Sequence, residues 1–160
     1  RGRLEERTYK FIQCVMDWTK LKLDHYHDQP VEHICITSLI DTNTYDRLYE
    51  NQKDLNHQSW QEFKEKHNTN CFLRENLSDI NLSNDVIWLW FFKERSDQTA
   101  SYVHIKGKQI RYRPNVFLIS KCKDFKFVQA SRKYIRSPFV QLDMNVDDYN
   151  KILKRFNKTT

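Results

Sequence analysis

The sequence predicts an α+β domain in which N-terminal helices precede an antiparallel sheet or small OB-like barrel, and a C-terminal amphipathic helix closes the chain. Three observations favour this class. Apolar residues recur at helical spacing near both ends, β-branched and aromatic residues gather in short runs of the second half, and charged turns separate those runs. The length of 160 residues suits one domain, and we expect residues 1–160 to be a single domain excised from a larger protein, because the chain begins at Arg1 and ends in a polar tail.

The first half of the chain predicts helices and one strand. Residues 4–23 place large apolar side chains near helical spacing, which predicts an amphipathic helix. Residues 31–40 are rich in Ile and Val between turn formers, and they predict a strand, with a short buried helix as the alternative. Residues 45–67 are polar with spaced apolar anchors such as Trp60, and they predict one or two surface helices joined near Asn56.

The second half predicts strands. Residues 86–92 form an uninterrupted apolar run, typical of a central strand that is covered on both faces, so that Trp88 and Trp90 are expected to be core residues. The runs at 101–105 and 109–113 flank a glycine-containing turn and predict a hairpin. Further short strands are predicted at 116–120, 125–128 and 139–144, which makes the second half an antiparallel meander.

A helix is predicted at the C-terminal end. Asn145 is a typical N-cap residue, and Asp147 and Asp148 follow it in the first turn, where the helix dipole favours negative charge. Lysine and arginine gather near the end of the same helix. Its apolar stripe consists of Val146, Tyr149, Ile152, Leu153 and Phe156.

Composition excludes several classes of protein. Only two glycines occur, Gly2 and Gly107, which argues against the glycine-rich loops of P-loop and Rossmann nucleotide sites. The four cysteines form no C-x-x-C pair, which is typical of free thiols. No apolar run reaches the length of a membrane span. We therefore expect an intracellular protein, nuclear rather than cytoplasmic, without a cofactor.

Positive charge is concentrated in the second half. Residues 1–80 contain 11 Lys and Arg against 14 Asp and Glu, whereas residues 81–160 contain 16 against 7. Residues 93–136 alone hold 12 basic and 3 acidic side chains, interleaved with aromatic rings. Such a surface attracts polyanions, because each neutralised phosphate releases counterions, and exposed rings can stack on unpaired bases.

These features predict a non-catalytic module that binds single-stranded or structured nucleic acid. If residues 109–113 form a strand, Arg111 and Arg113 share its outer face, while Ile110 and Tyr112 are directed toward the core. The predicted nucleic-acid-binding residues are Lys106, Lys108, Arg111, Arg113, Lys121, Lys123, Lys126, Arg132, Lys133, Arg136, Tyr112 and Tyr134. The alternative is a protein-interaction domain of a larger nuclear or ribonucleoprotein complex, because charged residues also cover the solvent face of any sheet.

One segment concentrates metal-capable side chains. If residues 31–40 form a strand, His33 and Cys35 share a face, and His25 and His27 could complete a tetrahedral zinc set. The spacing matches no standard zinc module, so we expect no bound metal and keep this set as an alternative. A second alternative is a metal-dependent nuclease that uses the carboxylates of Asp24, Asp28 and Glu32, since two-metal phosphoryl chemistry needs clustered carboxylates.

Overall fold

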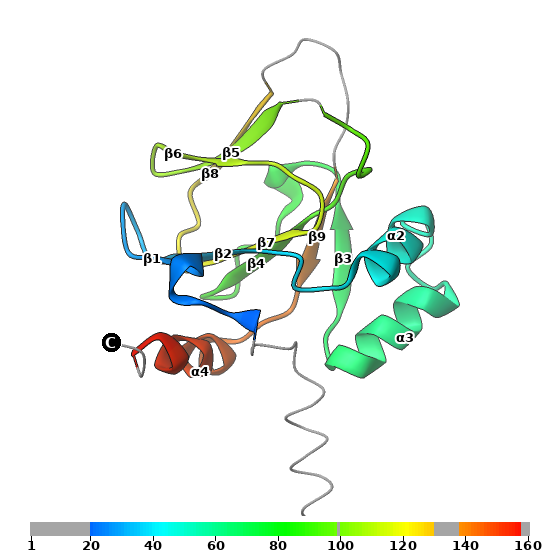
Figure 1. Ribbon diagram of the computed structural model, residues 1–160, viewed down its shortest axis with the longest axis horizontal. Helices are drawn as coiled ribbons and strands as arrows, with labels where there is room; N and C mark the ends of the chain where they lie inside the picture. Colours follow the sequence, from blue (N-terminus) through cyan, green and yellow to red (C-terminus); the bar gives the residue numbers. More distant parts are fainter. Residues whose placement is uncertain (1–19, 99, 130–137, 158–160) are drawn as a thin grey trace, which may run out of the picture.

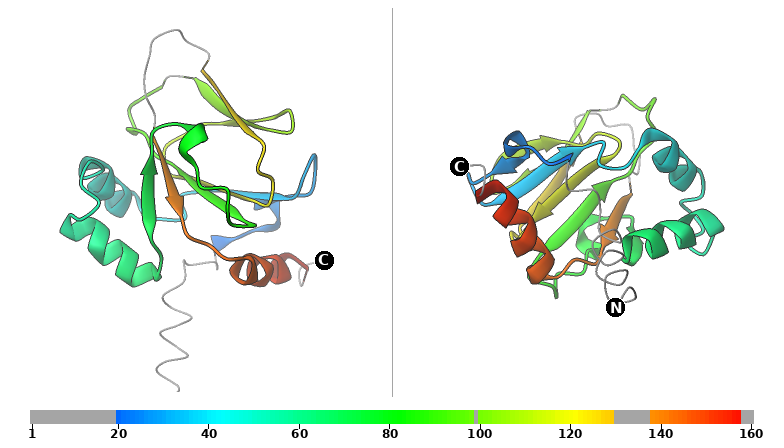
Figure 2. Two further views of the ribbon diagram at one scale, coloured as in Figure 1. Left: turned by 180° about the vertical axis from the view of Figure 1, so that it is seen from behind. Right: turned by 60° about the horizontal axis from the view of Figure 1, so that its bottom comes forward.

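The computed structural model describes residues 20–98, 100–129 and 138–157, which form three layers. A six-stranded sheet, sheet A, lies in the middle, helices cover one of its faces, and a three-stranded sheet, sheet B, covers the other (Figure 1). Two further views show α4 beside one end of sheet A and the α2–α3 pair beside the other (Figure 2). No helix among the described residues is long and apolar enough to cross a membrane.

All neighbouring strands in both sheets are antiparallel. In spatial order, sheet A consists of β1 (Tyr26–His27), β2 (His33–Thr37), β7 (Val116–Ser120), β4 (Ile87–Phe91), β9 (Phe139–Leu142) and β3 (Cys71–Arg74). Sheet B consists of β6 (Lys108–Arg111), β5 (Ser101–Ile105) and β8 (Phe125–Gln129). The helical elements are η2 (Leu23–His25), α2 (Thr42–Glu50), α3 (Gln58–His67), η3 (Leu77–Asp79) and α4 (Val146–Asn157).

Strand β4 is buried at every position, as its uninterrupted apolar run predicts. Successive side chains of a strand point to opposite faces, so Trp88 and Trp90 enter the core under the helices, while Leu89 and Phe91 enter the core under sheet B. Pairing with β7 on one side and β9 on the other confirms that β4 is a central strand. The two tryptophans are core residues, exposed by 5% and 0%.

The C-terminal helix is confirmed together with its cap. The Oδ1 atom of Asn145 accepts a hydrogen bond from the backbone N–H of Asp148 at 2.8 Å, which satisfies one of the unpaired donors of the first turn. Tyr149, Ile152 and Phe156 pack into the core on the helix-covered face of sheet A. Of the one or two helices predicted over residues 45–67, two are present, α2 and α3.

A buried asparagine joins three parts of the fold. The side-chain amide of Asn115 donates to the carbonyl oxygen of Ile40 at 2.6 Å, and its Oδ1 atom accepts from the indole N–H of Trp90 at 3.1 Å. The φ angle of Asn115 is 60°, in the left-handed region that asparagine tolerates better than most residues. Asn115 therefore holds the β2–α2 connection against the central sheet.

The second half of the chain is not a meander, and its strands do not close into a barrel. β7 pairs with β2 from the first half, and β9 pairs with β3. Burial explains this arrangement: β7 and β9 are buried at every position and must lie in a sheet covered on both faces, whereas β5 alternates between buried and half-buried residues. Sheet B is therefore a one-sided cover, and the predicted barrel is wrong.

The prediction of N-terminal helices is also wrong for the described residues. The helix predicted over residues 4–23 falls largely on residues 1–19, outside the described residues, and the first described α-helix begins at Thr42, after β1 and β2. The strand predicted over residues 31–40 is shorter, because Ser38 adopts a φ of 56° that turns the chain after β2. The alternative of a buried helix at this place is excluded.

The predicted hairpin is present as β5 and β6. Ile105 and Lys108 are Cα partners, so Lys106 and Gly107 form the two-residue turn. Both have positive φ, 49° and 87°, as the tight turn of a twisted hairpin requires. A Cβ atom at Gly107 would meet nothing within 4 Å, so the backbone angle, and not crowding, favours glycine at this position.

Candidate nucleic-acid interface

Sheet B presents one face to the core and one to solvent. Along β5, Ser101, Val103 and Ile105 are buried, whereas Tyr102 and His104 are half-buried and point the other way. The inner side chains of β5 pack against sheet A together with Ile110 of β6. The opposite side of the sheet therefore carries the polar and aromatic residues.

The strand registers set six outer side chains in two rows across the sheet. Tyr102 lies between Arg111 of β6 and Val128 of β8. His104 lies between Gln109 and Lys126 in the same way. Directly opposed residues in an antiparallel pair point to the same side, so these groups form a continuous patch. We call this patch the outer face of sheet B; it consists of Tyr102, His104, Gln109, Arg111, Lys126 and Val128.

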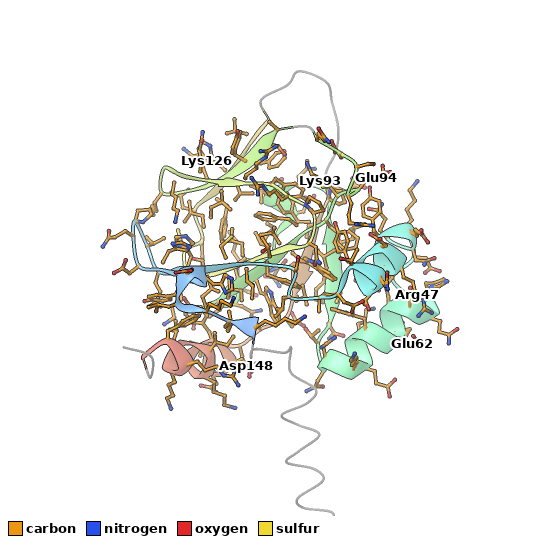
Figure 3. All side chains as sticks on the ribbon, in the orientation of Figure 1. Arg47, Glu62, Lys93, Glu94, Lys126 and Asp148 are labelled. Atoms are coloured by element: carbon orange, nitrogen blue, oxygen red, sulfur yellow. The ribbon has the colours of Figure 1, made fainter. Side chains whose placement is uncertain are left out.

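The chemistry of the outer face suits flat anionic ligands. Two rings occupy the middle strand, and the two cations, Arg111 and Lys126, lie at opposite corners on the edge strands. Neither cation forms an ion pair within the described residues. Val128 adds apolar surface, with 42% of it exposed. Figure 3 shows Lys126 on the layer of sheet B, across the molecule from Arg47 and Glu62 on the helices.

His104 adds a polar atom without a protein partner. Its Nε2 atom is shielded from solvent and makes no hydrogen bond within the described residues. A ring nitrogen of this kind has an unused capacity to donate or accept one hydrogen bond. The neighbouring amide of Gln109 can do both, which would suit contacts with base edges.

The remaining predicted basic residues are not gathered on this one face. Arg113 is exposed just beyond β6, and Lys123 is exposed in the β7–β8 connection. Lys106 lies in the hairpin turn, where its Nζ atom is 3.5 Å from the Oδ2 atom of Asp124. Lys121 is directed toward the helical layer, with its Nζ atom 5.6 Å from the ring centroid of Tyr149. Arg132, Lys133, Tyr134 and Arg136 lie outside the described residues.

Two predicted site residues are directed inward instead. Tyr112 is fully buried, and its hydroxyl accepts from the backbone N–H of Phe92 at 2.7 Å and donates to the carbonyl oxygen of Pro138. Lys108 lies on the inner side of sheet B, where its Nζ atom is 3.2 Å from the Nε2 atom of His33. Neither residue therefore belongs to the outer face of sheet B, because strand alternation gives both side chains to the side that faces sheet A.

Sequence reasoning left Tyr102 and His104 out of the candidate site. The signal was present in the alternation of residues 101–105, Ser-Tyr-Val-His-Ile, in which every second residue is small or aliphatic. A site predicted from the number of basic residues does not include aromatic side chains on the middle strand of the sheet. The sequence predicted that Arg111 faces outward, because alternation within residues 109–113 directs it away from Ile110, which is buried.

The histidine cluster does not form the zinc set that the sequence left as an alternative. The rings of His27 and His33 stack at 4.9 Å, but His25 is in η2, where its Nδ1 atom accepts from the backbone N–H of Lys22 at 3.0 Å. Within residues 20–98, 100–129 and 138–157, no three His, Cys, Asp or Glu residues group as metal ligands. The set of His25, His27, His33 and Cys35 is therefore not assembled.

The fully buried His33 instead links the two sheets. The ammonium group of Lys108 can only donate, so the Nε2 atom of His33 accepts and its Nδ1–H donates to the carbonyl oxygen of Val31 at 2.8 Å. Burial lowers the pKa of His33, and the Val31 hydrogen bond offsets part of that effect. The neutral ring thus holds the start of β6 against β2.

The carboxylates of the nuclease hypothesis also do not cluster in the described residues. Glu32 accepts hydrogen bonds from the hydroxyls of Tyr26 at 2.7 Å and Tyr149 at 3.1 Å, which fixes α4 to the first strands. Its carboxylate is part of the packing between these elements, and Asp24 and Asp28 are exposed. This arrangement does not supply the paired carboxylates that two-metal chemistry needs.

Comparisons of the chain with known protein families, curated proteins and solved structures found no match. The site described above therefore has to be interpreted from its own geometry and charge.

Proposed function

We propose that the domain binds single-stranded nucleic acid on the outer face of sheet B, without a catalytic step. One observation carries the proposal: Tyr102 and His104 lie on the middle strand of sheet B, on the face that points away from sheet A, between cations on both edge strands. Side chains two residues apart on a strand are about 6.6 Å apart, so each ring can stack on one of two adjacent bases. Such a protein acts inside the cell, and we favour the nucleus.

Charge supports a polyanion as the ligand. Residues 100–129, which include all of sheet B, contain seven Lys and Arg residues and one acidic residue, Asp124. The helical segment over residues 41–67 contains six acidic and four basic residues. Long-range attraction therefore draws a phosphate backbone toward sheet B and away from the helices α2 and α3.

A single strand suits this face better than a duplex. Stacking on Tyr102 and His104 requires bases whose flat faces are accessible, and a duplex buries those faces in its own stack. Phosphates on either side of two stacked bases can reach Arg111 at one edge and Lys126 at the other. The protein-interaction alternative would use a different surface, a cleft on the helical layer.

The test is fluorescence anisotropy of short labelled oligonucleotides, single-stranded and duplex, DNA and RNA, over a salt series. We expect Tyr102→Ala/His104→Ala to weaken single-strand binding about tenfold or more, because stacking contributes ~1–3 kcal/mol per base. We expect Arg111→Glu/Lys126→Glu to weaken it further and to reduce the salt slope by about 1.4, the loss of two phosphate contacts.

The matched control is Lys53→Glu/Lys154→Glu, which changes the charge equally at exposed sites on the helical layer. This control should bind nearly as well as the wild type. Absence of binding at ~50 mM salt, where electrostatic attraction is strong, would overturn the proposal. Equal losses in the control and in the sheet B variants would show attraction by net charge alone, which contradicts a site on the outer face.

A further inference from the structure

A cleft on the helical layer lies across sheet A from the proposed nucleic-acid site. It has a volume of about 400 Å³ and is lined by α2, α3 and the connection that leads from β2 to α2. Pockets that bind ligands occupy about 300–1,000 Å³. Its apolar floor consists of Leu39, Ile40, Leu48 and Phe63, all of them buried.

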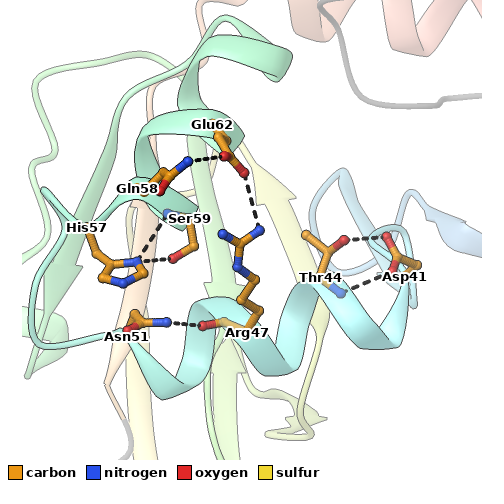
Figure 4. Close-up of polar contacts among 8 residues, drawn as sticks. All are labelled: Asp41, Thr44, Arg47, Asn51, His57, Gln58, Ser59 and Glu62. Atoms are coloured by element: carbon orange, nitrogen blue, oxygen red, sulfur yellow. Dashed lines mark hydrogen bonds and ion pairs between the residues drawn. The ribbon is translucent and has the colours of Figure 1, made fainter.

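The acidic groups at the rim already bind donors of the protein. Arg47 bridges from α2 to Glu62 of α3, with Nη1 and Oε2 at 3.2 Å, and Gln58 donates to the other carboxylate oxygen at 3.0 Å (Figure 4). The carboxylate of Asp41 caps α2 by accepting from the backbone N–H and the hydroxyl of Thr44 at 3.0 and 2.7 Å. These contacts hold the walls of the cleft in place.

The basic groups at the rim make fewer contacts that balance their charge. Lys20 and Lys66 both line the cleft and are exposed. The Nζ atom of Lys20 donates to the carbonyl oxygen of Leu39 at 3.3 Å, a neutral acceptor that leaves its charge unbalanced. Neither lysine is within 4.0 Å of a carboxylate oxygen in the described residues. The rim can therefore receive a negative charge.

His67 supplies an independent sign of an incomplete site. Its ring packs against Phe63 with centroids 4.6 Å apart, and its Nδ1 atom is shielded from solvent without a hydrogen-bond partner in the described residues. A buried polar atom in this state costs free energy until it receives a partner. His67 lines the same cleft as the two lysines.

We propose that this cleft docks a peptide segment of a partner protein that carries a large apolar side chain next to a carboxylate. The apolar side chain covers Leu48 and Phe63, and the carboxylate lies between Lys20 and Lys66. Nucleic acid does not fit this position, because the floor offers no exposed ring for stacking. Both faces of the domain can be occupied together, since sheet A separates them.

The experiment is selection of a random peptide library displayed on phage against the wild-type domain, followed by affinity measurements on the enriched peptides. We expect enrichment of peptides in which Asp or Glu adjoins Leu, Phe or another large apolar residue. Lys20→Glu/Lys66→Glu should weaken the binding of such peptides by about tenfold or more, or ~1.4 kcal/mol. Both lysines are exposed, so the variant should retain its fold, which a thermal melt verifies.

Two controls make the result specific. Lys53→Glu/Lys154→Glu makes the same change of charge outside the cleft and should leave peptide affinity unchanged. Arg111→Glu/Lys126→Glu alters only the outer face of sheet B and should also leave it unchanged, whatever its effect on nucleic acid. A selection that enriches no acidic-apolar peptides, or enriched peptides that bind the Lys20→Glu/Lys66→Glu variant as well as the wild type, would overturn the proposal.

Discussion

The two faces of sheet A are covered in different ways. Under the helices, large rings contact one another, with Trp90 stacked on Phe117 at 4.9 Å and set edge-on to Trp60 at 6.3 Å. Under sheet B the core is smaller, and its outer members, such as Phe125 and Phe127, are only half-buried. We therefore expect the helix-covered core to contribute more to the free energy of unfolding than the core under sheet B.

The largest expected effect on the free energy of unfolding comes from removing an aromatic ring from one of the two cores. Trp90→Ala should lower the free energy of unfolding by about 3–5 kcal/mol, because it empties a fully buried site among several rings. Phe127→Ala should cost less than about 3 kcal/mol, since its half-buried ring loses less contact. Urea denaturation gives both values, and equal losses would contradict the difference between the two cores.

A second pair of variants compares the polar links of the two layers. Asn115→Ala leaves the indole N–H of Trp90 and the carbonyl of Ile40 without partners, and it places alanine at a φ of 60°; we expect a loss of about 2–4 kcal/mol. Tyr112→Phe leaves the buried N–H of Phe92 without its acceptor and the carbonyl oxygen of Pro138 without the hydroxyl donor, and it should cost about 1–3 kcal/mol. Thermal and urea unfolding of both variants measure which one loses more free energy of unfolding. A larger loss for Tyr112→Phe than for Asn115→Ala would contradict this expectation.

The pH dependence of stability should come partly from the helical side. Burial, with a smaller contribution from Lys66, lowers the pKa of His67 from 6.5 to about 4. The unfolded chain then binds the proton more readily than the folded one between these values, so stability falls as the pH drops from about 6.5 toward 4. His67→Gln should make this fall shallower, whereas His104→Gln, on the outer face of sheet B, is the matched comparison. Urea unfolding at several pH values in this range measures the free energy of unfolding. The same dependence of this free energy on pH in His67→Gln and in the wild type would contradict the expectation.

The smallest effect is expected on the outer face of sheet B. Arg111→Ala should change the free energy of unfolding by less than about 0.5 kcal/mol, because the side chain is exposed and makes no ion pair within the described residues. The same variant should weaken nucleic-acid binding severalfold. A large loss of stability with unchanged binding would show that this face is structural.

Local patterns predicted the elements with the strongest burial. Strand β4 follows from seven consecutive apolar residues, 86–92, and α4 follows from its N-cap, its acidic first turn and its apolar stripe. The β5–β6 hairpin follows from Gly107 between two alternating runs. Each of these signals is contained within about a dozen residues, so neighbouring side chains suffice to determine it.

The candidate site was predicted only in part. Arg111 and Lys126 were among the predicted residues, and alternation in residues 109–113 already directed Tyr112 toward the core, although Tyr112 was also assigned to the site. The inward position of Lys108 was missed, and the alternation that places Tyr102 and His104 on the outer face was not used. The helical cleft was not predicted at all. Its floor and rim come from three separated segments of chain, which include Lys20, Ile40 and Phe63.

The sequence by itself determined the α+β class, the central strand, the helical character of residues 45–67, the final helix and the basic character of the second half. The tertiary structure decided that β2 pairs with β7, that the strands divide between two sheets, and which of the basic residues meet on one face. The physical reason is the range of the forces involved. Periodicity, caps and turns act between near neighbours, whereas strand pairing and layer packing depend on which apolar faces, distant along the chain, bury each other most completely.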